Sequence, residues 1–368
     1  MQFRYKKITV KVGSNVLAKS DGTLNVARIA HLVDQIAFLH KNGVEVVLVS
    51  SGAVAAGRAV MQPSKKTDAV SQRQLWAALG QVKLISRYSD FFQEDGLVCA
   101  QVLTTKENFS SRGHYLNMKN CMTTLLENKV IPIVNENDTI SVTELMFTDN
   151  DELSGLIASM VDSEALIILS NVNGVYSSHP ENEDAELIER IELSGKEPEN
   201  AITGEQSNFG RGGMLTKFRI AKKVAGDGIA VHVANGTSEN VLIDLLDINK
   251  QPAHTYFVPG QKTSSGVKKW IGYSDGFAKG EVVINDGAVK ALTSAKAVSL
   301  LPVGITRIDR EFRKGDLIKI VSESGKTIGL GKAGYGSERL GREKVSAKQK
   351  PVVHYDYLYL ENRIGSHE

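Results

Sequence analysis

Short apolar runs alternate with longer amphipathic segments over the first 250 residues, and this alternation constrains the fold more than any other feature. The apolar runs are rich in β-branched residues and are predicted strands: Ile8–Val12, Val44–Val49, Leu97–Leu103, Val130–Val134, Ala165–Leu169 and Ile229–Ala234. The predicted helices between and after them cover about 26–41, 68–92, 114–128, 152–161, 214–225 and 241–246. Strands that alternate with helices predict a three-layer α/β/α sandwich with a mainly parallel sheet.

From Lys279 onward the pattern changes to short strands separated by turn residues, which predicts a small β-rich barrel or sandwich. The charge changes near the same place. Residues 261–368 contain 19 Lys and Arg and 12 Asp and Glu, whereas the first 260 residues contain 25 and 30. We therefore expect a domain over 1–260, a linker over 261–277, a β-rich domain over 278–355 and a tail over 356–368. The sequence Gly329–Gly334 matches G-x-G-x-x-G, but it lies among these short strands, and we interpret its glycines as turn residues.

The composition excludes several classes of protein. A net charge of +2 does not favour binding to nucleic acid or to an anionic membrane. Cys99 and Cys121 form no disulfide framework, and the eight histidines have no zinc-site spacing, so we expect no bound structural metal. No apolar run approaches the ~18 residues of a membrane span. We expect a soluble cytoplasmic protein without a targeting segment.

The segment Lys129–Asp151 is the strongest candidate for a binding site. A predicted buried strand, Val130–Val134, ends in Asn135, Glu136, Asn137 and Asp138, and a second polar group follows at Thr148–Asp151. Ligands of open α/β sheets bind beyond the carboxyl ends of the strands. These carboxylates and amides suit the ammonium and α-carboxylate of a small amino acid, or cations around a phosphate. The alternative interpretation is a pair of polar turns, because turns favour the same residues.

Three glycine-containing loops lead into predicted helices: Gly13-Ser14, Ser50-Ser51-Gly52 and Gly210–Gly213. A helix N-terminus with exposed N–H groups favours an anion. Lys11 and Lys217 lie next to two of these loops. For any one loop a tight turn is the better explanation, and a lone lysine is usually a solvated charge. Together they predict a phosphate site.

The motifs KVGSNVL, VSSGAVAAGR, VIPIVNENDTI, TDNDELS, LSNVNGVY and GRGGMLTK, in this order, resemble the amino-acid kinase family. The resemblance is strongest to members that phosphorylate the γ-carboxylate of L-glutamate with ATP and Mg²⁺, the first step of proline biosynthesis. The last hundred residues resemble a PUA module. The resemblance also implies a homodimer or homotetramer and feedback inhibition by proline.

The resemblance assigns a role to particular residues. Lys11, Lys217 and Asp151 would be catalytic, with Asp151 orienting both lysines. The residues that would bind glutamate are Ser51, Asn135, Asp138, Asp149 and Asn150. The residues that would bind ATP are Lys11, Gly13, Ser14, Ser170, Asn171, Arg211, Gly212, Gly213, Met214, Leu215, Thr216 and Lys217.

The chain departs from the family pattern in two places. Asn171 and Asn173 stand where the family usually has aspartates, and Arg211 replaces a small hydroxyl residue. Two other functions remain open at this point. One is phosphorylation of another substrate, namely acetylglutamate, aspartate or uridylate. The other is RNA binding by the basic C-terminal segment, in which Tyr335, Tyr355, Tyr357 and Tyr359 are interspersed, although a solvated basic face with core tyrosines is the simpler interpretation.

Overall fold

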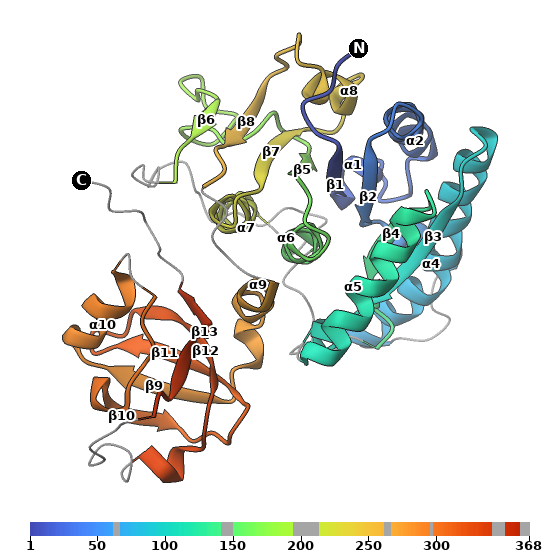
Figure 1. The fold of residues 1–368 in the computed structure, drawn as a ribbon. Coiled ribbons are helices and arrows are strands. Elements are labelled where there is room, and N and C mark those ends of the chain that lie inside the picture. The colour runs from blue at the N-terminus through green and yellow to red at the C-terminus, as the bar shows by residue number, and fades with distance from the viewer. Residues whose placement is uncertain are drawn as a thin grey trace. The chain divides into compact units, whose positions relative to one another are not determined.

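The computed structural model describes residues 1–61, 67–109, 111–140, 150–193, 213–260, 266–294, 297–340 and 350–360. The chain forms two compact units (Figure 1). The first unit comprises Met1–Asn108 and Leu116–Lys262, and the second comprises Phe109–Tyr115 and Thr263–Glu368. Whether the expected domains, 1–260 and 278–355, each fold independently remains a prediction.

The first unit is built on an eight-stranded sheet with the order β3-β4-β2-β1-β5-β7-β8-β6. Its strands are β1 (Lys7–Val12), β2 (Glu45–Ser50), β3 (Cys99–Thr104), β4 (Ile131–Glu136), β5 (Ala165–Ser170), β6 (Arg190–Ile191), β7 (Ala230–Asn235) and β8 (His254–Phe257). All neighbouring pairs are parallel except β7 and β8. The mainly parallel sheet is confirmed, and all six expected strands are present within two residues of their expected bounds. The last two strands in this order, β8 and the edge strand β6, were not predicted.

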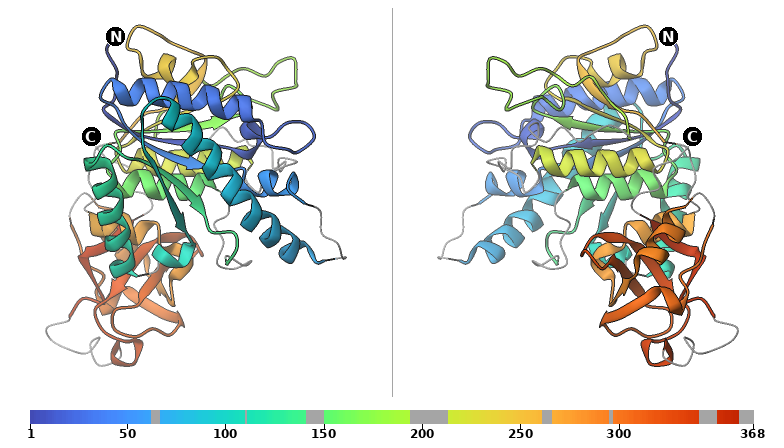
Figure 2. Two further views of the ribbon diagram at one scale, coloured as in Figure 1. Left: turned by 90° about the vertical axis from the view of Figure 1, so that its right-hand side faces the viewer. Right: turned by 90° about the vertical axis from the view of Figure 1, so that its left-hand side faces the viewer.

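Helices cover both faces of this sheet (Figure 2). They are α1 (Ser14–Leu17), α2 (Val26–Lys41), α3 (Ala53–Arg58), α4 (Ala69–Glu94), α5 (Arg112–Glu127), α6 (Asn150–Met160), α7 (Met214–Gly226) and α8 (Val241–Leu246), with the short 3-10 helix η1 (Lys106–Phe109). One face carries α2, α4 and α8, whose apolar side chains form a core with β1, β2, β4, β5 and β7. On the other face α6 and α7 pack together, α6 against β1 and α7 against β7. The expected three-layer sandwich is confirmed.

Local sequence signals explain where the longest helices begin and end. The Asn25 side chain accepts a hydrogen bond from the Arg28 backbone N–H and caps α2. The Asp68 carboxylate accepts bonds from the backbone N–H groups of Val70 and Ser71 and caps α4 in the same way. After α2, Gly43 takes a φ of +86°, which glycine adopts without strain.

The second unit contains a five-stranded sheet with the order β10-β9-β11-β12-β13. Its strands are β9 (Gly280–Ile284), β10 (Ile305–Arg310), β11 (Leu317–Ser322), β12 (Thr327–Ala333) and β13 (Val353–Leu360). Its helices are α9 (Gly266–Gly272) and α10 (Asp286–Thr293), with the 3-10 helices η2 (Asp275–Phe277), η3 (Pro302–Gly304) and η4 (Ser337–Arg339). The helix α9 lies in the segment expected as a linker and packs on β13, which continues into the expected tail.

The interpretation of the G-x-G-x-x-G glycines as turn residues is wrong for the first two. Gly329 and Gly331 lie inside β12, where they face the neighbouring strand β13. A Cβ atom on Gly329 would lie 2.1 Å from the Tyr359 carbonyl oxygen, and one on Gly331 would lie 2.4 Å from a methyl carbon of Val353. Glycine is therefore required for the close approach of two strands, not for a turn or for phosphate binding.

A short segment from the middle of the chain belongs to the second unit. The carbonyl oxygen of Phe109 accepts a hydrogen bond of 2.8 Å from the Trp270 indole N–H and a longer one of 3.4 Å from the Ser274 hydroxyl. Phe109 and Trp270 are both buried. The segment Phe109–Tyr115 runs from the end of η1 to the first turn of α5, so the second unit includes residues far apart in the sequence.

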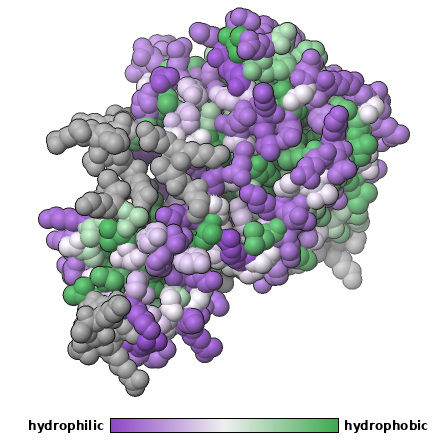
Figure 3. All heavy atoms as spheres, in the orientation of Figure 1, coloured by the Kyte–Doolittle hydropathy of each residue, from purple (hydrophilic) through white to green (hydrophobic). Residues whose placement is uncertain are grey.

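Hydrophilic side chains predominate on the face that Figure 3 shows. Among the described helices, none combines the length and the apolar character needed to cross a bilayer.

Of the four C-terminal tyrosines, Tyr335 is buried in the second core, whereas Tyr355 and Tyr357 are about two-fifths exposed on β13.

Candidate functional site

The carboxyl ends of four parallel strands bring the predicted site residues to one edge of the first sheet. Lys11 is the fifth residue of β1, and Ser51 directly follows β2. Asn135 lies at the end of β4, and Ser170 ends β5. Since β1 pairs with both β2 and β5, and β2 pairs with β4, these ends lie next to one another. This is the edge at which open α/β sheets bind ligands.

Two lysines from different elements contact one buried aspartate at this edge. The Lys11 Nζ atom lies 2.5 Å from Asp151 Oδ1, and the Lys217 Nζ atom lies 3.1 Å from Asp151 Oδ2. Lys11 comes from β1, Asp151 from the first turn of α6 and Lys217 from the first turn of α7. The Asp151 side chain is fully buried, and the two lysines are less than a tenth exposed. The predicted catalytic residues are therefore brought together.

The electrostatics of this cluster favour an anionic ligand. Burial by itself would raise the pKa of the Asp151 carboxyl, but the ammonium groups of Lys11 and Lys217 hold this pKa well below its usual range. The N-terminus of α6 also stabilises the negative charge. Asp151 is thus ionised at neutral pH, and the three side chains carry a net charge of +1 in a site with little water. A phosphate group would be attracted to such a site.

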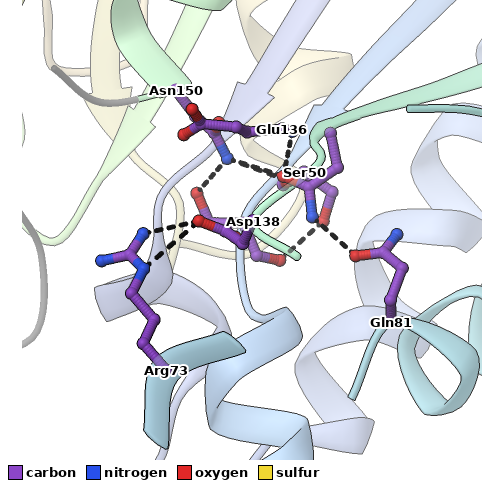
Figure 4. A network of polar contacts seen from close by, with 8 residues as sticks. Ser50, Arg73, Gln81, Glu136, Asp138 and Asn150 are labelled. Atoms are coloured by element: carbon purple, nitrogen blue, oxygen red, sulfur yellow. Dashed lines mark hydrogen bonds and ion pairs between the residues drawn. The ribbon is translucent and has the colours of Figure 1, made fainter. Parts of the chain in front are cut away.

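A second cluster, on the β2 and β4 side, is built from amides and hydroxyl groups (Figure 4). The Asn150 side-chain amide donates to the Ser51 hydroxyl at 2.9 Å, to the Asn135 side-chain oxygen at 3.0 Å and to the Ser50 carbonyl at 3.1 Å. The Glu136 backbone N–H also donates to the Asn135 side-chain oxygen. These bonds hold three of the residues predicted to bind substrate, Ser51, Asn135 and Asn150, in one fixed arrangement.

The long helix α4 supports this cluster with residues that the sequence analysis missed. The Arg73 guanidinium donates to Asp138 Oδ1, with an Nη2–Oδ1 distance of 2.7 Å (Figure 4). About two turns further along, the Gln81 side-chain oxygen accepts a hydrogen bond from the Asn135 amide at 3.0 Å. Gln81 comes eight positions after Arg73, so both lie on one side of the helix. The local sequence does not distinguish these two residues from the other polar residues of α4.

Helix α4 is itself held against α3 by direct backbone contact. A Cβ atom on Gly80 of α4 would lie 1.7 Å from the Ala53 carbonyl oxygen, and a Cβ atom on Gly57 of α3 would lie 1.9 Å from the Trp76 carbonyl oxygen. Only glycine permits such an approach at both places. The helix α3 directly follows the Ser51–Gly52 loop, so this contact fixes α4 relative to the amide and hydroxyl cluster of Ser51, Asn135 and Asn150. We call this group the substrate cluster, because these residues are predicted to bind substrate.

The residues predicted to bind ATP lie around the first turns of α1 and α7 and at the end of β5. Gly213 precedes α7 and has no side-chain cap, so Met214, Leu215 and Thr216 form an uncapped first turn. Gly13 occupies the same position before α1. Ser170 is buried at the end of β5, whereas Asn171 is exposed. An uncapped helix N-terminus beside Lys217 suits an anion.

Three of the predicted site residues, Asp149, Arg211 and Gly212, lie outside the described residues. Every other predicted residue lies at the carboxyl edge of the sheet or in the helix turns that flank it. In the part of the chain that the structure describes, no group of three or more His, Cys, Asp or Glu side chains could hold a metal ion. The expected absence of a structural metal stays a prediction.

Comparison with known proteins adds two family matches. Residues 6–235 match the model of the amino acid kinase family, and residues 280–350 match that of the PUA domain. Among curated proteins, the chain is 57% identical to a protein named glutamate 5-kinase from Bacteroides thetaiotaomicron, over 98% of this chain and 100% of the relative. It is 48% identical to a protein of the same name from Chlorobaculum tepidum, over 97% of this chain and 98% of that relative.

Proposed function

The chain belongs to the amino acid kinase family, and we propose that it transfers the γ-phosphoryl group of ATP to the γ-carboxylate of L-glutamate. The products would be L-glutamyl 5-phosphate and ADP. The family resemblance inferred from the motifs is confirmed by these matches. The observation that supports the reaction most directly is the contact of both Lys11 and Lys217 with the buried carboxylate of Asp151.

This lysine pair suits the chemistry of phosphoryl transfer. The transferring group spreads negative charge over its oxygens, and catalysis consists mainly of positioning and of electrostatic stabilisation. Lys11 and Lys217 would contact the phosphates of ATP, and Asp151 would hold both ammonium groups in place. No general base is needed, because a carboxylate nucleophile is already ionised at neutral pH. The attacking oxygen of the substrate therefore needs only alignment and shielding from water.

The nucleotide would lie across the first turn of α7 and the end of β5. Its phosphates would be bound by Gly13, Ser14 and the N–H groups of residues 213–216, and Ser170 and Asn171 would lie beside the nucleoside. Arg211 and Gly212 are part of the same proposal. The exposed position of Asn171 leaves its side chain accessible from solvent.

Magnesium fits this site as a companion of the nucleotide. Mg²⁺ in kinases is usually held by substrate phosphates together with one or two carboxylates and water. The carboxylate seen in contact with both lysines is that of Asp151, and each of its oxygens faces an ammonium group. When bound, the ion would neutralise phosphate charge. The protein side chains would supply the remaining positive charge through Lys11 and Lys217.

The amino acid would occupy the amide and hydroxyl cluster on the β2 and β4 side. Asp138 would accept hydrogen bonds from its ammonium group, with Asp149 as a second acidic residue. Ser51, Asn135 and Asn150 would bind its carboxylates, and the Asn150 amide would exchange a hydrogen bond within the cluster for one to the ligand. Their fixed arrangement around Asn150 supports this assignment. Acetylglutamate lacks the ammonium group, so this site would favour free glutamate.

Regulation and assembly follow the same proposal. Proline shares the ammonium and α-carboxylate of glutamate, so we expect it to compete for this cluster and to inhibit the first step of its own synthesis. We also expect a cytoplasmic homodimer or homotetramer. A proline titration at glutamate concentrations below KM tests the inhibition. An unchanged rate of glutamate phosphorylation would mean that proline does not compete with glutamate.

The experiment that tests the reaction is a comparison of phosphoryl acceptors. ADP release is measured with MgATP and L-glutamate, acetylglutamate, aspartate or uridylate, and acyl phosphates are trapped with hydroxylamine. We expect ADP release and hydroxamate with glutamate, at a rate at least about 100-fold above the other acceptors. Phosphorylation of another acceptor, with none of glutamate, would keep the family and reject the substrate.

A further inference from the structure

The side chain of Asp138, which is proposed to bind the ammonium group of the substrate, already has a cationic partner. The Arg73 Nε and Nη2 atoms donate to Asp138 Oδ1 at 3.3 and 2.7 Å. The Asp138 side chain is 11% exposed, whereas the Arg73 side chain is 34% exposed. These two bonds use two of the five N–H donors of the guanidinium group, and a side chain that is one-third exposed can offer the others to a ligand.

The charge of the substrate requires a cation in this part of the site. Glutamate carries two carboxylates and one ammonium group at neutral pH. The lysine pair would serve the γ-carboxylate end, where phosphate is transferred. At the other end, the described cluster consists of carboxylates, amides and hydroxyl groups, and Arg73 is the cation seen in contact with it. A guanidinium group suits a carboxylate in a poorly exposed site, because it can form two parallel, charge-assisted hydrogen bonds with it.

The pair of Arg73 and Asp138 presents charges in the order that an amino acid head group needs. An α-amino acid carries its ammonium and carboxylate groups on one carbon atom, so its binding site needs an anionic and a cationic side chain next to each other. Arg73 and Asp138 supply both in direct contact. We propose that Arg73 binds the α-carboxylate of the substrate while Asp138 binds its ammonium group. This inference rests on the proposed function and adds a residue that determines substrate specificity.

The framework around Arg73 supports this role because it holds the guanidinium at a fixed place. Gln74, the next residue of α4, donates to the Thr139 carbonyl oxygen at 2.8 Å, which ties the helix to the loop that carries Asp138. Gln81 ties the same helix to Asn135. The glycine contact between α4 and α3 fixes its position further. A preorganised guanidinium binds a carboxylate with little loss of side-chain entropy.

Substrate analogues separate a binding role of Arg73 from a structural one. Glutarate has both carboxylates of glutamate but no ammonium group, and 4-aminobutyrate has the ammonium group but no α-carboxylate. Both are tested as competitive inhibitors of glutamate phosphorylation, so that Ki reports their binding without turnover. The full-length wild type is compared with Arg73→Gln, with Arg73→Lys and with Arg87→Gln. Arg87 is an exposed arginine on the same helix and is the matched control.

For Arg73→Gln we expect KM for glutamate and Ki for glutarate to rise together by about 100-fold. Ki for 4-aminobutyrate and kcat should change by less than about threefold, because only binding to the α-carboxylate is lost. Arg73→Lys keeps the positive charge but loses the planar guanidinium group, which can bind both oxygens of a carboxylate. It should raise KM by about 10-fold. Arg87→Gln should behave as wild type.

Two results would overturn the inference. If Ki for 4-aminobutyrate rises with KM while Ki for glutarate does not, Arg73 acts only by positioning Asp138. If KM for glutamate is unchanged in Arg73→Gln, Arg73 has no part in binding. Failure of the proposed function is a separate result, because it appears in the wild type as the absence of glutamate-dependent hydroxamate.

Discussion

The contact between α3 and α4 leaves no room for a methyl group at Gly80, so Gly80→Ala tests how the substrate cluster is positioned. The added Cβ atom would lie 1.7 Å from the Ala53 carbonyl oxygen and 2.4 Å from the Gly57 backbone nitrogen. Both are backbone atoms, which cannot rotate away. Real Cβ atoms essentially never come within 3.0 Å of such a neighbour, so α4 must move by about 1.3 Å relative to α3.

A movement of this size would disrupt the substrate cluster from a distance. Arg73 and Gln81 lie on α4 on either side of Gly80, and their bonds to Asp138 and Asn135 are 2.7 and 3.0 Å long. A shift of about 1.3 Å takes such bonds beyond hydrogen-bonding range. We expect KM for glutamate to rise by about 100-fold. The free energy of unfolding should fall by about 3 kcal/mol, and the Tm by roughly 6 °C.

The assay for Gly80→Ala combines glutamate kinetics with thermal unfolding followed by circular dichroism. The control is Gly226→Ala at the end of α7, where an added Cβ atom meets no heavy atom within 4 Å. The same chemical change at Gly226 should leave KM unaltered and raise stability by about 0.5 kcal/mol. A wild-type KM in Gly80→Ala would refute the argument that backbone contact between α3 and α4 positions the substrate cluster.

Two further predictions concern buried charge. Asp151→Asn removes the carboxylate that Lys11 and Lys217 contact, so it should lower the free energy of unfolding by about 3–5 kcal/mol in urea titrations and lower kcat; unchanged stability would contradict the buried ion pairs. Burial of His232 lowers its pKa to about 3, so the folded state binds fewer protons than the unfolded state between pH 3 and 6.5. Its contribution to stability is therefore complete above pH 6.5 and falls by about 2 kcal/mol at pH 5. His232→Gln should flatten this dependence in denaturation measured at pH 5 and 7.5, and an equally steep dependence in the variant would contradict it.

Most of the first sheet could be predicted because its strands are buried on both faces. β1, β2, β4, β5 and β7 are short, mainly apolar runs with a polar residue at or next to the carboxyl end, and this pattern marks both the strand and that end. The two strands β8 and β6, at one end of the sheet order, lack it. β6 has two residues, and β8, with the sequence HTYF, has two half-buried side chains, so neither differs from a loop in pattern.

The second unit shows a different limit of sequence patterns. Gly329 and Gly331 match a phosphate-loop motif, yet the reason for glycine is the closeness of β13, which comes more than twenty residues later in the chain. The inclusion of Phe109–Tyr115 is hidden for a similar reason, because its partner Trp270 is 161 residues away from Phe109. Contacts between distant residues leave no local periodicity.

The residues of the candidate site also differ in how far the sequence predicts them. Lys11, Asp151 and Lys217 lie in glycine-rich or acidic motifs, and the family resemblance assigned them roles before their contacts were known. Arg73 and Gln81 lie in no such motif. They belong to a long helix whose polar residues would each be explained by solvent exposure, and their hydrogen bonds to Asp138 and Asn135 join residues more than fifty positions apart.

The most direct test of the central claim compares Lys217→Ala with wild type in the glutamate-dependent hydroxamate assay. Arg219→Ala is the control, because it removes an exposed cation from the same helix. We expect hydroxamate from wild type and Arg219→Ala, and a fall in kcat of at least about 100-fold in Lys217→Ala, because a cation that contacts the transferring group is lost. Wild-type turnover in Lys217→Ala, with the variant folded, would contradict the proposed role of the lysine pair.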